Sequence, residues 1–72
     1  MDSNIHVLDV VAVTRDIPAG GLLRGQVGTV VEELAPGVYE VEFSDEQGTA
    51  YATASLRATE LLVLHYHPVE AA

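Results

Sequence analysis

Short apolar segments alternate with turn-forming residues along the whole chain, and this pattern predicts a protein built from β-strands. Glycine, proline, aspartate and serine separate segments that are rich in β-branched, aromatic or small apolar residues. The segment with the strictest alternation places Tyr39, Val41 and Phe43 on one side and Glu40 and Glu42 on the other, so its core face is fixed. The expected strands span residues 5–13, 26–34, 38–43, 49–54 and 61–66.

The first connection, residues 14–23 (TRDIPAGGLL), predicts a long loop. Pro18 fixes its own φ and the glycine pair that follows permits positive φ, so the chain must turn there. Long loops in compact domains are where binding functions concentrate. We therefore expect this loop to contribute to function, with Ile17, Leu22 and Leu23 holding it against the body of the domain.

The remaining connections predict tight turns. Pro36 and Gly37 stand at the second and third positions of a four-residue turn, which is the arrangement of a type II turn. We expect Gly48 to adopt the left-handed conformation, and Gly28 to mark a β-bulge or a tight bend inside its strand. Residues 55–60 are too few for a full α-helix and suit one turn of 3-10 helix.

The strand faces indicate what covers the sheet. The first and last expected strands are apolar on both faces, so we expect both faces to be covered. In residues 49–54, alanines oppose Tyr51 and Thr53, and such small side chains would let another strand or a second subunit approach closely. We expect Tyr51 to join Tyr39 and Phe43 in the core.

These elements predict a single all-β domain over residues 1–72. The expected fold is a small five-stranded SH3-like barrel with a long first loop and a one-turn 3-10 helix before the last strand. Residues 1–4 and 68–72 are expected to be frayed ends.

The charge balance excludes several partners. The chain carries 11 acidic side chains against 3 arginines and no lysine, a net charge of −8 on 72 residues. Such a chain repels the phosphates of nucleic acids and of anionic membranes. There is no cysteine, so neither a disulfide nor a thiolate metal site is possible.

Hydrophobic content favours self-association. Apolar residues make up 49% of a chain whose small size leaves little interior to hide them, so we expect a homodimer or higher oligomer. The first residues lack the pattern of a signal peptide and no apolar run approaches a membrane span. We therefore expect a cytoplasmic protein.

Several spaced segments resemble a known family. RGQVGTVVE, PGVYEVEF, a D-x-x-G turn and a closing LLVL are together similar to small bacterial proteins described only as a domain of unknown function. This resemblance implies an SH3-like fold and no assigned activity. The resemblance also implies neighbouring genes that are toxin-like or uncharacterised, which is a lead toward a partner-neutralising role.

Two looser resemblances concern the same region. The stretch from TRDIP to RGQVG is similar to the SH3-like domain of the nitrile hydratase β-subunit, and this implies a barrel that docks on a partner. The metal-binding cysteine motif of that enzyme belongs to its other subunit. Residues Gly25–Val30 also resemble a KOW motif, whose RNA-binding loops are basic, whereas this chain has no lysine. The residues that match the nitrile hydratase segment are Thr14, Arg15, Pro18, Arg24, Gly25 and Gly28.

The candidate partner-binding residues lie on the long loop and the third strand. Arg15 and Arg24 could grip a partner carboxylate or pair internally with Asp9 or Asp16. Across the hairpin, Glu32 and Glu33 are expected to form an acidic patch with the glutamates of the third strand, either as a solvated face or as a surface for a basic partner. The full candidate set is Arg15, Asp16, Ile17, Leu22, Arg24, Glu40 and Glu42.

The sequence contains only a weak indication of a metal site. His65 and His67 stand two apart, so both would project from one strand face, and with His6 or Glu70 they could bind a metal. Two exposed histidines are the favoured interpretation, because nothing supplies a third ligand at a recognisable spacing. We expect no cofactor and no metal site.

The expected function is therefore a non-enzymatic protein-interaction or scaffold module that self-associates. No serine lies in a nucleophile motif and no carboxylate pair has the setting of an acid–base site. Two alternatives stay open: an antitoxin-like or immunity-like partner of a neighbouring gene product, and an accessory subunit of a metal enzyme.

Overall fold

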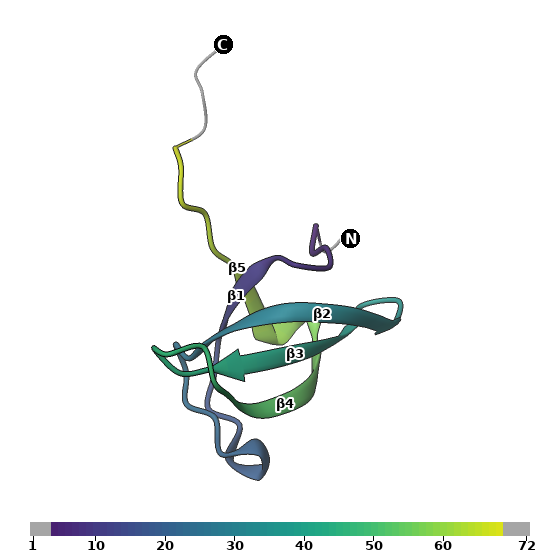
Figure 1. Cartoon of the computed structure of the whole chain (residues 1–72). Coiled ribbons are helices and arrows are strands. Elements are labelled where there is room, and N and C mark those ends of the chain that lie inside the picture. Colours follow the sequence, from purple (N-terminus) through teal and green to yellow (C-terminus); the bar gives the residue numbers. More distant parts are fainter. Residues whose placement is uncertain (1–3, 69–72) are drawn as a thin grey trace.

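The computed structural model describes residues 4–68 and shows five strands in one antiparallel sheet (Figure 1). The order across the sheet is β4-β3-β2-β1-β5, so consecutive strands pair and the last strand returns beside the first. Two 3-10 turns interrupt the strands. The elements are β1 (Val10–Val13), η1 (Pro18–Gly20), β2 (Val27–Ala35), β3 (Val38–Ser44), β4 (Ala50–Arg57), η2 (Ala58–Glu60) and β5 (Leu61–Val63).

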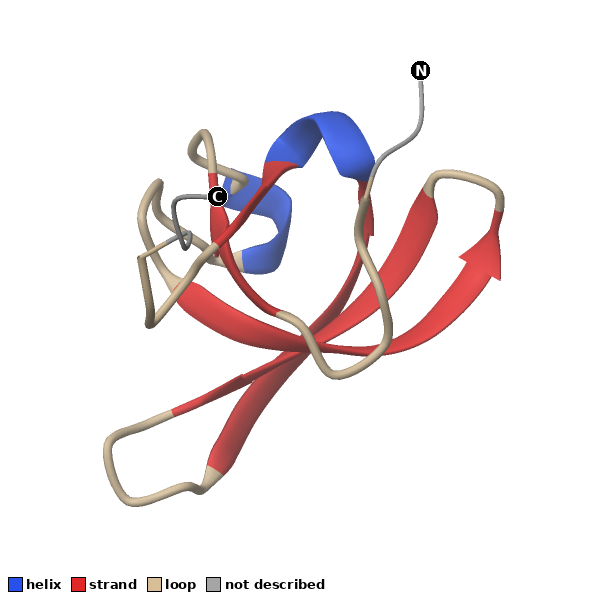
Figure 2. Ribbon diagram, turned by 90° about the horizontal axis from the view of Figure 1, so that it is seen from above, coloured by secondary structure: helices blue, strands red, loops and turns tan. Residues whose placement is uncertain are grey.

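This architecture confirms the predicted all-β, five-stranded, barrel-like fold with a long first loop and a 3-10 turn before the last strand. Seen from above, the strands cross and curve around a common interior and do not form a flat layer (Figure 2). Most of the expected frayed ends, residues 1–3 and 69–72, lie outside the described residues, as does Glu70.

The core forms where the alternation of β3 meets its neighbours. Tyr39, Val41 and Phe43 are buried as predicted. Burying such a side chain contributes about 1.5–3 kcal/mol, so these positions dominate the stability of so small a domain. The other buried residues come from β1, β2, β4, β5, the long loop and the segment before β1: Ile5, Val11, Val13, Leu22, Val30, Leu56 and Leu61.

The first and last strands are shorter than predicted. Residues 5–9 precede β1 because the chain turns at His6–Asp9, where the Asp9 amide donates to the His6 carbonyl at 3.0 Å and Leu8 has a φ of 80°. β5 ends at Val63 instead of continuing through residue 66. Its partner β1 begins only at Val10, whose carbonyl accepts a bond from the Leu64 amide.

The fourth strand is longer than predicted, and this corrects the place of Tyr51. β4 extends to Arg57 because Leu56 pairs with Tyr39 and is buried, so η2 holds only the last three residues of the expected 3-10 segment. Ala52, Ala54 and Leu56 point inward, which leaves Tyr51 outward and 50% exposed rather than in the core. Its ring still touches the core edge, with a centroid 6.4 Å from that of Phe43.

Gly28 marks a close approach of strands and not a bulge. It pairs in register with Val11 on one side and Phe43 on the other. A Cβ added there would lie 2.7 Å from Cγ1 of Val41 and 2.9 Å from the carbonyl oxygen of Glu42. The register shifts of β2 occur later, between Val30 and Glu32 and between Glu33 and Ala35.

The two predicted glycine turns are confirmed. Gly37 has a φ of 77°, the value that a type II turn requires at its third residue, and Ala35 pairs with Val38 across it. Gly48 has a φ of 83°, and Asp45 closes the turn by accepting from the amides of Gln47 and Thr49.

Candidate interaction surfaces

The long loop is tied to the domain by polar contacts at its two ends. The Arg15 guanidinium forms an ion pair with Glu60 in η2, and the Thr14 amide donates to the Glu60 carbonyl at 3.0 Å. The Asp16 carboxylate accepts from the backbone amide of Arg24 at 2.8 Å. These contacts fix the loop, so its exposed side chains are presented from a defined backbone.

The carboxylate that pairs with the Arg15 guanidinium is neither of the two expected ones. Arg15 pairs with Glu60 and not with Asp9 or Asp16, because η2 brings Glu60 beside the start of the loop. The Glu60 pKa is lowered, first by the hydrogen bond from the Arg57 amide at 2.9 Å and further by Arg15, while burial opposes the shift. Within residues 4–68, no carboxylate forms an ion pair with Arg24.

The apolar members of the candidate set close the loop. Ile17 and Leu22 form an isolated antiparallel bridge, and Leu22 is only 2% exposed. Leu22 therefore anchors the loop in the core, and its side chain is not on the surface where a partner could contact it. Ile17 is half-buried against the same core. The expectation for Leu23 was wrong, because the Ile17–Leu22 bridge turns Leu22 inward and leaves Leu23 65% exposed.

The outer surface of the sheet is apolar over three neighbouring strands. Val11 and Val13 are buried, so Val10 and Ala12 point outward, because successive side chains of a strand alternate between its faces. Ala12 pairs with Val27 on one side and with Leu62 on the other. We call this surface the apolar outer face; its members are Leu8, Val10, Ala12, Val27, Val31, Leu62 and Leu64.

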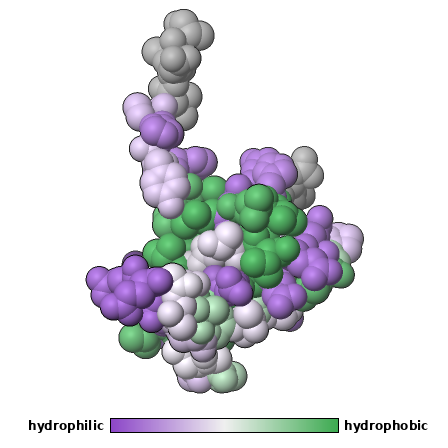
Figure 3. Space-filling model, viewed as in Figure 1, coloured by the Kyte–Doolittle hydropathy of each residue, from purple (hydrophilic) through white to green (hydrophobic). Residues whose placement is uncertain are grey.

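The apolar outer face is accessible and contiguous. Leu8 is 75% and Leu62 58% exposed, and Val27 and Val31 are also exposed. The Leu8 amide donates to the Val30 carbonyl at 2.7 Å, which brings Leu8 next to Val31. Hydrophobic side chains gather on this side of the molecule, over β1, β5 and β2 (Figure 3). Val10, Ala12 and Leu64 lie between them and are half-buried, so the predicted apolar outer strand surface exists as one patch of exposed and half-buried aliphatic side chains.

The same sheet turns acidic over β3. Glu40 and Glu42 alternate with the buried residues of β3 and therefore point outward, where Glu40 pairs with Glu32. Glu33 does not join them, because the register shift after Val30 pairs Glu33 with the inward-pointing Tyr39. The predicted acidic patch therefore loses Glu33. We call the remaining three glutamates the acidic face.

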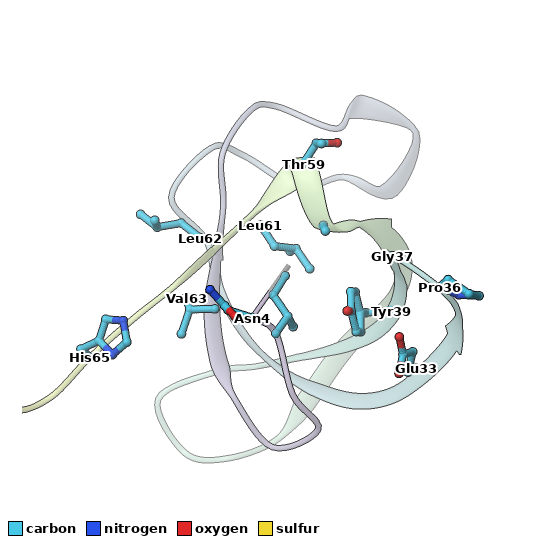
Figure 4. A pocket seen from close by; sticks show the side chains of 12 residues that line it. Asn4, Glu33, Pro36, Gly37, Tyr39, Thr59, Leu61, Leu62, Val63 and His65 are labelled. Atoms are coloured by element: carbon cyan, nitrogen blue, oxygen red, sulfur yellow. The ribbon is translucent and has the colours of Figure 1, made fainter. Parts of the chain in front are cut away.

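Glu33 instead lines a pocket at one end of the barrel. The pocket has a volume of about 800 Å³, and the core residues Ile5, Tyr39 and Leu61 lie at its floor. Glu33 and His65 stand on opposite sides of the opening (Figure 4). The two titratable groups are apart, so they do not form an acid–base pair.

The histidines are separate from one another. His6 lies 3.7 Å from the Asp9 carboxylate, His65 borders the pocket, and His67 is exposed. Among residues 4–68, no group of three or more histidine, cysteine or acidic side chains could hold a metal ion. The same residues contain no helix of the length and hydrophobicity that crossing a membrane would require.

Sequence reasoning missed two features of these surfaces. The pocket is lined in part by Ile5, whose apolar neighbours predict a strand although it packs as part of the segment before β1. The separation of Glu33 from the acidic face depends on a β-bulge, and two adjacent glutamates carry no signal of it. By contrast, the apolar outer face follows directly from strands that are apolar on both sides.

Comparison with known proteins gives one family. The family model described as a domain of unknown function, DUF4926, matches residues 7–63. The matched region includes all five strands and the long loop. Searches of curated proteins and of solved structures gave no significant match.

Proposed function

From the premise that the chain belongs to the DUF4926 family, whose description assigns no function, we propose that it is a non-enzymatic protein-interaction module that self-associates through the apolar outer face. The proposal keeps the expected protein partner and identifies the first one as a second copy of the chain. The cytoplasmic location stays a prediction.

Self-association is supported by the division of the outer surface of the sheet into an apolar part and an acidic part. β5, β1 and β2 present aliphatic side chains outward, whereas β3 presents glutamates. A solvated antiparallel sheet usually has one apolar and one polar face, and here the outward side chains of β1, β5 and the first part of β2 are aliphatic except Thr29, while Glu32 of β2 follows after the register shift. Contiguous exposed apolar residues rimmed by polar ones are typical of protein interfaces.

The size of the apolar outer face suits a modest dimer. A standard interface buries about 800 Å² per partner, roughly a seventh of the 5345 Å² that this chain exposes. The four most exposed members are about half accessible, so each contributes on the order of 1 kcal/mol when buried. Two copies supply on the order of 8 kcal/mol, which the cost of association partly offsets. We expect dissociation constants in the micromolar range or weaker.

The test is the solution mass over a concentration series from low micromolar to millimolar, by light scattering and sedimentation. We expect a dimer or higher oligomer to appear across this series. Leu62→Ser should shift the protein toward monomer, because it replaces an exposed leucine of β5 that lies beside Ala12 in the apolar outer face. Leu34→Ser removes an exposed leucine beside the hairpin turn and should leave the mass unchanged. A monomer throughout the series would contradict the proposal.

A neutralising role toward a basic partner is the second candidate, and the acidic face supports it. Its three glutamates share one side of the β2–β3 hairpin, and the chain carries a net charge of −8. Such a surface speeds the approach of a cationic protein. Co-purification with the product of a neighbouring gene tests this role, and a neighbour that is harmless when expressed alone would count against it.

A further inference from the structure

The free edge of β4 is the feature that neither the family nor the apolar outer face explains. β4 is the outermost strand on its side of the sheet and pairs with β3 alone among the described residues (Figure 1). An edge strand turns a row of backbone N–H and C=O groups toward solvent, and these groups can pair with another extended segment. At eight residues, β4 is long enough to template such pairing.

The two edges of the sheet differ in protection. β5, the opposite edge, has only three residues, and short edge strands are one of the ways in which proteins prevent pairing. β4 has no charged residue and no proline between Ala50 and Leu56. The one register shift between β3 and β4 occurs at its start, beside Ser44, and leaves the centre of the strand regular. β4 is therefore the edge that lacks these protections against pairing with another strand.

The inner side of β4 leaves room for apolar side chains of an added strand. Ala52 and Ala54 point toward the core and are only partly buried. An added strand lies about 4.8 Å from β4, so its inward side chains would sit beside these alanines and extend the core. Gln26, the residue before β2, reaches β4 at a side chain, where its Nε2 donates to the Tyr51 hydroxyl at 2.8 Å.

The outer side of β4 favours basic residues in an added strand. Thr53 pairs with Glu42 and Ser55 pairs with Glu40, so the acidic side chains stand one strand away from the edge, behind short side chains. Outward residues of an added strand would lie about 10 Å from the β3 backbone, a span that an extended lysine or arginine and a glutamate can bridge. Because this distance is close to the Debye length at physiological salt, the attraction between these charges should weaken as salt is added.

A second copy fits this edge poorly. Joining two β4 strands would place the glutamates of both copies on one surface, between chains that each carry a net charge of −8. A cationic segment would gain attraction where a second copy meets repulsion. The edge therefore favours a heterologous occupant.

We propose that β4 binds an extended segment of a partner protein that alternates apolar and basic residues, by adding it to the sheet as a sixth strand. The apolar residues pack beside Ala52 and Ala54, and the basic residues reach Glu40 and Glu42. This surface is distinct from the apolar outer face, so the inference goes beyond the proposed self-association and does not depend on it.

The test uses a short capped peptide with lysine and valine at alternate positions, titrated into the isotopically labelled protein. We expect the largest amide shift changes along β4 and weaker affinity at higher salt. A peptide with glutamate in place of lysine should not bind. Glu42→Gln and Glu40→Gln should each weaken binding about two- to fivefold, the range for one exposed ion pair.

Two protein variants separate the surfaces. Thr53→Lys puts a natural edge guard at an exposed position and should abolish binding of the lysine–valine peptide while the spectrum stays folded. Leu62→Ser, which tests self-association, should leave peptide binding unchanged. Shift changes confined to β1, β2 and β5, equal binding of the glutamate peptide, or binding that survives Thr53→Lys would each overturn the proposal.

Discussion

Replacing Gly28 by alanine is the most direct test of how tightly the sheet is closed. The added Cβ would lie 2.7 Å from Cγ1 of Val41, 2.8 Å from Cδ1 of Phe43 and 2.9 Å from the carbonyl oxygen of Glu42. Both side chains are fully buried. The carbonyl belongs to the β3 backbone that pairs with β2, so it can withdraw only if the two strands separate locally.

The expected cost follows from overpacking. Forcing one extra methyl group into a well-packed core costs about 1–3 kcal/mol. A domain of this size has a total stability of roughly 4–11 kcal/mol, so the loss is a large fraction of it. At about 4–8 °C per kcal/mol for domains of 60–100 residues, we expect the melting temperature to fall by at least about 4 °C.

Gly20→Ala is the matched control for this experiment. A Cβ at Gly20 would meet Cδ1 of Leu22 at 3.6 Å, an ordinary contact, and the residue does not have positive φ. Both substitutions reduce the freedom of the unfolded chain in the same way, an effect of about 0.4–1 kcal/mol toward stability. The difference between their urea midpoints therefore measures packing at Gly28. Equal stability of the two variants would refute the close approach of β2 and β3.

Three further predictions concern the turn, the pH dependence and the charge. Gly37→Ala should destabilise by about 1–2 kcal/mol and Gly37→Asn by less in urea unfolding, because φ is 77° and a Cβ would meet no neighbour. The lowered pKa of Glu60 contributes stability that is complete above its ordinary value of 4.5 and is lost as pH falls through the folded pKa, so Glu60→Gln should lessen the acid dependence of the melting temperature. Added salt should strengthen self-association measured by sedimentation, because it screens the repulsion between chains of net charge −8; weaker association would contradict this.

Sequence reasoning succeeded where a local pattern determines the structure. The alternation of β3 identified its buried residues, and the Pro36-Gly37 turn and Gly48 took the expected conformations. In each case the cause lies within a few neighbouring residues: side-chain alternation in a strand, or the positive φ that glycine accepts. The family resemblance was equally local in its motifs and is confirmed over residues 7–63.

Sequence reasoning failed where contacts between segments that are distant in the sequence determine the structure. The lengths of β1 and β5 depend on each other, so neither could be read from its own apolar run. Arg15 pairs with Glu60 because the sheet brings η2 beside the loop, although Asp9 and Asp16 are nearer in sequence. Tyr51 is aromatic and lies in an alternating strand, but the length of β4 and the burial of Leu56 turn it outward.

The pairing of β1 with β5 gives the apolar outer face a place in the folding sequence. β2, β3 and β4 form a meander of local contacts, whereas β1 and β5 come from opposite ends of the described residues. Contacts between distant segments form late because closing a long loop costs chain entropy. A chain emerging from the ribosome can therefore assemble its acidic face before Leu62 has joined Ala12. Self-association would then be restricted to molecules that have finished folding.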